Sequence, residues 1–102
     1  MTDYHKEAVT RYQIPFTTAV TLDNYIQRGT SPGDFLRAVL HNDYRMAYLH
    51  ADDRNKEILH KIMAYMVDVA PLACWGGPEF VKRWQEVGGI NGLMAKMKEV
   101  EA

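Results

Sequence analysis

The sequence predicts an all-α protein, a small compact bundle of about five to six helices with no β-sheet. Apolar residues recur every three or four positions through most of the chain, which is the spacing of a buried helix face, and no segment shows the sustained alternation of a strand. Proline, glycine and aspartate stand between these segments, where helices begin and end. With 102 residues, 47% of them hydrophobic, we expect residues 1–102 to form a single helical domain with a small core.

Two helices are predicted before residue 30. Tyrosine or alanine at every fourth position indicates a short helix over 3–13, which ends before Pro15. Pro15 opens the second helix, and Gly29 ends it because glycine readily adopts the left-handed conformation of a helix C-terminus. Three threonines weaken this second helix, at positions 17, 18 and 21.

The next helix is predicted to start at Ser31 and to run at least to Leu40. Ser31 is a good capping residue, and Pro32 suits the first helical position because its missing N–H would be unpaired there. Asp34 stands where the acid of a capping box reaches back. The apolar face of this helix consists of Phe35, Leu36, Val39 and Leu40.

A break is expected at residues 41–43, because asparagine and aspartate compete with the helix for backbone hydrogen bonds. Asn42 or Asp43 then caps a second short helix. Asp52-Asp53 forms the next cap, and the longest helix covers 55–70 and ends at a proline. Its buried face consists of Ile58, Leu59, Ile62, Met63, Met66, Val69 and Ala70.

An apolar loop leads to a helix that begins at Pro78 and ends at Gly88-Gly89. Apolar residues at helical spacing continue over 91–102. This tail either docks as a last helix or frays and becomes ordered only against a partner. Segments 1–13 and 91–102 are therefore the expected peripheral helices of the domain.

Composition narrows the class of protein. The formal net charge of −1 disfavours bulk binding to nucleic acid. A lone cysteine, Cys74, excludes an internal disulfide and a multi-cysteine zinc site, and it suits a reducing cytoplasm. No apolar run approaches the ~20 residues that cross a bilayer, and the N-terminus lacks an apolar signal core. We expect a protein of the cytoplasm with no membrane contact, whose small core leaves room for a homo-oligomer.

Two motifs carry a resemblance to a known group. The first reads Pro32-Gly33-x-Phe35-Leu36-x-Ala38-Val39-Leu40-x-Asn42-Asp43, and the second reads Cys74-Trp75-Gly76-x-Pro78. Over about residues 14–84 this order resembles a group of small proteins encoded by bacteriophages and prophages. The group has no assigned activity, so the resemblance implies a context, the cytoplasm of a bacterial host, and no mechanism.

Polar and aromatic side chains gather around the predicted break. Residues 41–43 offer a titratable ring, an amide and a carboxylate within one turn. These groups either bind a ligand or a partner's backbone, or they form hydrogen bonds with the unpaired backbone groups of their own helix end. Tyr44 and Tyr48 share one helix face with arginines near them, which predicts an exposed contact patch. The candidate binding residues are His41, Asn42, Asp43, Tyr44, Arg45, Tyr48, Arg54, Trp75, Gly76 and Gly77.

The segment 74–77 has structural and functional interpretations. Glycines before a helix start suit an anion, but no P-loop pattern follows, so a tight turn that seats Trp75 in the core is favoured. Cys74 could be a nucleophile, yet its apolar neighbours favour burial. A metal site is not expected, because the histidines at 41, 50 and 60 are nine and ten residues apart rather than three or four.

Three functions follow, in order of preference. The first is a small phage-encoded binding protein without cofactor, which acts stoichiometrically on a bacterial host protein as an inhibitor of a defence system or a modifier of a host enzyme. The second is an oligomer that sequesters a nucleotide at helix N-termini. The third is an enzyme built on Cys74.

Overall fold

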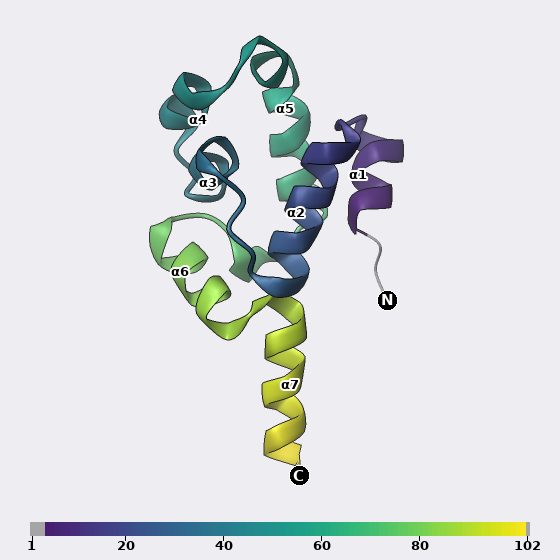
Figure 1. Ribbon diagram of the computed structural model, residues 1–102, viewed down its shortest axis with the longest axis vertical. Coiled ribbons are helices and arrows are strands. Elements are labelled where there is room, and N and C mark those ends of the chain that lie inside the picture. Colours follow the sequence, from purple (N-terminus) through teal and green to yellow (C-terminus); the bar gives the residue numbers. More distant parts are fainter. Residues whose placement is uncertain (1–3, 102) are drawn as a thin grey trace.

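The computed structural model describes residues 4–101, which form seven α-helices, one short 3-10 helix and no strand within that range (Figure 1). The all-α class is thus confirmed. The elements are α1 (Tyr4–Tyr12), α2 (Phe16–Arg28), α3 (Asp34–Leu40), α4 (Tyr44–His50), α5 (Asp53–Asp68), η1 (Leu72–Cys74), α6 (Pro78–Val87) and α7 (Gly89–Glu101).

Seven α-helices exceed the expected five to six because both terminal segments are complete helices. Helix α1 places Ala8 in the core with no exposed surface. Helix α7 starts directly after the cap of α6, at Gly89 rather than at Asn91. The parts of the two predicted terminal segments at 1–3 and 102 lie outside the described residues.

The core is held together by three aromatic side chains whose polar atoms are satisfied. Tyr25 and Tyr65 have no exposed surface, and Trp84 is almost fully buried. Trp84 Nε1–H donates to the carbonyls of Tyr25 (3.1 Å) and Ile26 (3.2 Å), and the Tyr25 hydroxyl donates to the Cys74 carbonyl (2.6 Å). These bonds join α2 to α6 and to η1, and η1 is a single helical turn where a loop was expected.

Several predicted helix ends are confirmed. Gly29 and Gly88 cap α2 and α6 in the left-handed conformation, and Pro78 is in the first turn of α6. Asp43 caps α4 by accepting from the Met46 N–H (3.1 Å). Asp52 caps α5 by accepting from the Asn55 N–H (2.8 Å), although α5 covers 53–68 rather than 55–70.

The predicted start of α3 is wrong. The helix begins at Asp34, its N-cap is Gly33, and no side chain caps it. Gly33 has φ +89° and ψ 172°, which is far from helical and excludes Ser31 and Pro32 from the helix. The Ser31 hydroxyl instead accepts a hydrogen bond from the Arg37 guanidinium.

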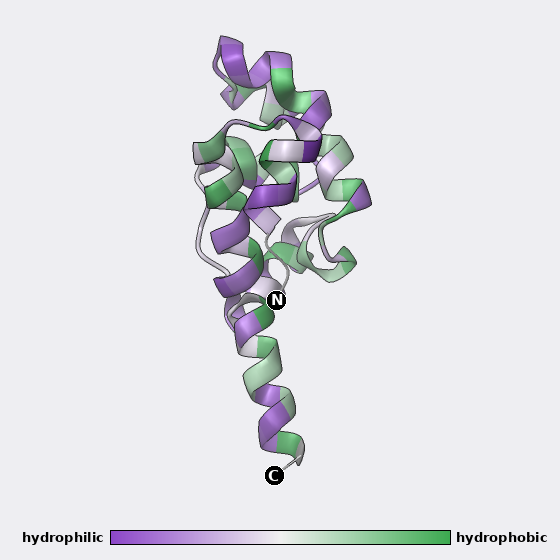
Figure 2. Cartoon of the chain, turned by 90° about the vertical axis from the view of Figure 1, so that its right-hand side faces the viewer, coloured by the Kyte–Doolittle hydropathy of each residue, from purple (hydrophilic) through white to green (hydrophobic). Residues whose placement is uncertain are grey.

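Helix α7 projects from the body of the molecule (Figures 1 and 2). With α7 included, the protein measures 49 × 28 × 19 Å along its principal axes. Its first turn packs against the end of α2, so closely that a Cβ at Gly89 would lie 2.6 Å from the Gln27 carbonyl carbon. Beyond Gly92 every described side chain is exposed. The tail therefore docks by its first turn only, and it exposes an apolar stripe formed by Leu93, Met94, Met97 and Val100.

Candidate functional site

Helix α4 is the most exposed helix of the body, because six of its seven residues are exposed. Of its seven residues only Ala47 is buried. Tyr44 and Leu49 keep 61% and 64% of their surface exposed, and Tyr48 keeps 47%. A short helix that buries one methyl group and exposes large apolar side chains gains little from its own fold, which is typical of a surface that contacts something else.

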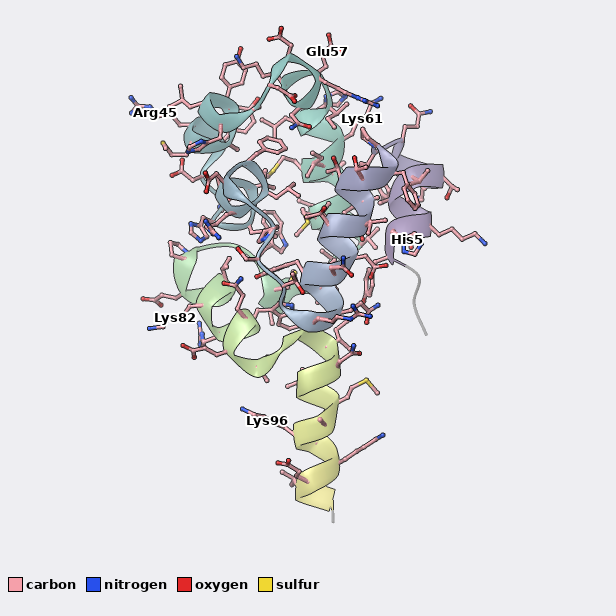
Figure 3. All side chains as sticks on the ribbon, viewed as in Figure 1. His5, Arg45, Glu57, Lys61, Lys82 and Lys96 are labelled. Atoms are coloured by element: carbon pink, nitrogen blue, oxygen red, sulfur yellow. The ribbon has the colours of Figure 1, made fainter. Side chains whose placement is uncertain are left out.

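The arrangement of side chains around α4 follows from its helical period. Successive residues turn by about 100°, so Arg45 and Leu49 point away from the side on which Ala47 packs. Figure 3 shows Arg45 extending into solvent from the outer edge of the molecule. Tyr48 lies towards α5, where the Lys56 Nζ is 4.8 Å from the centre of its ring.

We define the α4 face by its exposed aromatic, aliphatic and basic side chains. It comprises Tyr44, Arg45, Met46, Tyr48 and Leu49 of α4 with Lys56 of α5. Tyrosine, methionine and arginine are the residue types that interfaces between proteins favour. The two acids that flank α4, Asp43 and Asp52, are engaged in capping backbone N–H groups.

A small hollow, the α3–α4 cleft, opens beside the α4 face. Its volume is about 180 Å³, and its wall includes Asp34, Arg37, His41, Asp43, His50 and Met46. Ligand sites for drug-sized molecules usually span roughly 300–1,000 Å³. The α3–α4 cleft therefore has the size for one protruding side chain rather than for a nucleotide.

Charges in the α3–α4 cleft are partly compensated within the protein. The Arg37 guanidinium lies 3.3 Å from the Asp34 carboxylate and also bonds Ser31. Asp43 is held by its capping bond. His41 and His50 supply ring nitrogens on opposite sides of the break, so the cleft can both donate and accept hydrogen bonds.

The predicted site residues divide into two groups. His41 and Asp43 line the cleft, and Asn42 is exposed beside it with a left-handed φ of +59°. Tyr44, Arg45 and Tyr48 belong to the α4 face, whereas Arg54 is exposed in the first turn of α5. Residues 75–77 do not line the cleft. The Gly76 N–H donates to the Leu40 carbonyl (2.8 Å), and Trp75 packs half-buried against the core, so this segment serves the fold.

Cys74 lies in the core with no exposed surface. Burial raises the pKa of its thiol to about 12. At neutral pH the sulfur is therefore protonated and inaccessible, whereas a nucleophilic cysteine needs a thiolate and an open path. This agrees with the interpretation that Cys74 is a buried core residue.

Neither a metal-binding cluster nor a membrane-spanning helix occurs among the described residues. Within residues 4–100, no three histidine, cysteine, aspartate or glutamate side chains come together as a metal ion would require. Across the described helices, none has both the length and the apolar character to cross a membrane.

Two members of the site were not proposed as binding residues from the sequence. His50 lines the cleft, and Leu49 is the most exposed apolar residue of α4. The signal for Leu49 was present, since a helix with a single small buried residue must turn its other apolar residues outward. His50 had no such signal, because its approach to His41 depends on the angle at which α4 folds back on α3.

Comparisons with models of known protein families, with curated proteins and with solved structures found no match to this chain. The resemblance to small phage proteins therefore stays a prediction.

Proposed function

We propose that this protein is a stoichiometric binding protein that docks the α4 face onto another protein. The observation that carries the proposal is the balance within α4, which buries only Ala47 and exposes Tyr44, Tyr48 and Leu49. The energy of protein interfaces is concentrated in a few aromatic and arginine side chains near the centre of a contact. The α4 face presents such residues together, beside a cleft that takes one side chain.

The resemblance to phage proteins suggests the class of partner. A small phage protein in a host cell would meet bacterial proteins, and occupation of a surface inhibits or modifies a defence system or an enzyme without catalysis. The α4 face suits this role because its tyrosines and its helical backbone are already ordered in the free chain, which reduces the entropy lost on binding.

A matched pair of variants tests the proposal. Leu49 and Val67 are 64% and 63% exposed, and each is the penultimate residue of its helix, so an aspartate has the same small effect on either helix. We expect the wild-type chain and Val67→Asp to retain one bacterial protein from host lysate at a constant molar ratio. Leu49→Asp should lose it. Equal retention by both variants, or capture of nothing by the wild type, would refute the proposal.

A further inference from the structure

A second hollow, the α2–α3 cleft, has a different chemistry from the α4 face. Its volume is about 250 Å³, and its wall includes Thr17, Thr18, Thr21, Asp34, Phe35 and Asn55. These side chains come from α2, α3 and the first turn of α5, so the cleft exists only when the three helices are packed.

The threonines of α2 are unexplained by the fold. All three lie within the first six residues of the helix, where β-branched side chains lower helix propensity. The core face of α2 is made by other residues, and Thr17 is exposed. Residues that oppose local structure without packing in the core are typical of functional sites.

Hydrogen-bonding capacity remains open in the cleft. The Thr21 hydroxyl donates to the Thr17 carbonyl (2.9 Å), which leaves its oxygen able to accept. The side chains of Thr18 and Asn55 make no hydrogen bond with another described residue. Each can donate and accept, and both are only partly exposed where they line the cleft.

The lining also excludes some classes of ligand. No lysine, arginine or histidine is among the described residues that line the cleft, while Asp34 contributes a carboxylate. The Asp34 carboxylate is paired with Arg37, which does not itself line the cleft. A phosphate would therefore find no free cation among the lining side chains. Phe35 adds an apolar side chain to the lining.

From this combination we infer that the α2–α3 cleft binds a neutral sugar ring. The sugar hydroxyls exchange hydrogen bonds with Thr18, Asn55 and Asp34, and an apolar face of the ring lies against Phe35. The same chemistry is offered by a free monosaccharide and by one unit of a glycan. A glycan would add contacts with neighbouring units outside the cleft.

Nuclear magnetic resonance on the labelled full chain tests this. Glucose, ribose and N-acetylglucosamine are each titrated to about 10 mM, which would fill ~90% of a site with a Kd near ~1 mM. A short oligomer of N-acetylglucosamine distinguishes a glycan from a free sugar by binding more tightly than the monomer. At least one sugar should move the amide signals of Thr17, Thr18, Thr21 and Asn55.

Two variants and two controls complete the experiment. Thr18→Val and Asn55→Ala should each weaken binding by about fivefold, the equivalent of one lost hydrogen bond. Thr10→Val, on α1 and outside the cleft, should not, and inorganic phosphate should leave the cleft signals unmoved. Cleft signals that respond to no sugar, or to phosphate alone, or equal weakening by Thr10→Val, would overturn the inference. Asn55→Ala keeps the backbone N–H that donates a hydrogen bond to Asp52, so the helix cap stays intact. This variant therefore tests the inference on its own if Thr18→Val fails to fold.

Discussion

Two neighbouring glycines give a sharp test of how α7 is attached. Gly88 and Gly89 both have left-handed φ angles, +86° and +66°, so alanine at either position carries the conformational penalty of ~1–2 kcal/mol. Their surroundings differ. A Cβ at Gly88 would meet its nearest atom at 3.5 Å, an ordinary contact, whereas at Gly89 it would lie 2.6 Å from the Arg28 nitrogen and the Gln27 carbonyl carbon.

The overlap at Gly89 is with backbone, which cannot rotate away. Restoring a contact of 3.4 Å from 2.6 Å requires α7 and α2 to separate by about 0.8 Å, and such overpacking typically costs ~1–3 kcal/mol. Gly89→Ala should therefore lower Tm by roughly 4–24 °C more than Gly88→Ala does in a domain of this size. The assay is thermal unfolding followed by circular dichroism. Equal Tm values for the two variants would refute the reasoning that close backbone approach holds α7 in place.

Three further predictions concern the core and the tail. Trp84→Phe removes the N–H that donates to two carbonyls of α2. It should lower the free energy of unfolding, measured by urea denaturation, by about 1–3 kcal/mol. An unchanged denaturation midpoint would contradict this. Cys74 should resist thiol reagents in the native protein and react at once in denaturant. Burial raises the pKa of the Cys74 thiol above its value in the unfolded chain. The contribution of this thiol to stability is therefore complete below pH ~9 and is lost as the pH rises towards 12. Over that interval the free energy of unfolding should decline less steeply in Cys74→Ala than in the wild type. Deleting residues 93–102 should reduce the helical circular dichroism signal but change the free energy of unfolding by less than ~0.5 kcal/mol, because the described side chains in that stretch are exposed. A larger loss of stability would show that the tail packs on the body.

Features set by a few adjacent residues were predictable from the sequence. Gly29 and Gly88 end helices because glycine adopts the left-handed cap without steric cost, and Asp43 and Asp52 cap helices through bonds to N–H groups three residues away. The exposure of Tyr44 and Tyr48 also follows from local pattern, since the only small residue of that helix faces the body.

Features set by tertiary packing were not predictable. The start of α3 depends on the unusual backbone of Gly33, which the pattern Ser-Pro-Gly-Asp does not distinguish from a helical start. Both clefts assemble residues from separate helices, as Asn55 of α5 joins the threonines of α2. Which of these residues come close together depends on the angles at which the helices cross, and the spacing of residues in the sequence does not determine those angles.

The central claim is that α4 carries the partner-binding surface, and photo-crosslinking tests it most directly. Tyr44→p-benzoylphenylalanine and Phe80→p-benzoylphenylalanine each replace one exposed ring by another, the first on the α4 face and the second on α6. After irradiation in host lysate, we expect one discrete adduct from position 44, abolished by excess wild-type chain but not by excess Leu49→Asp. An adduct from position 80 alone, or the same adduct from both positions, would contradict it.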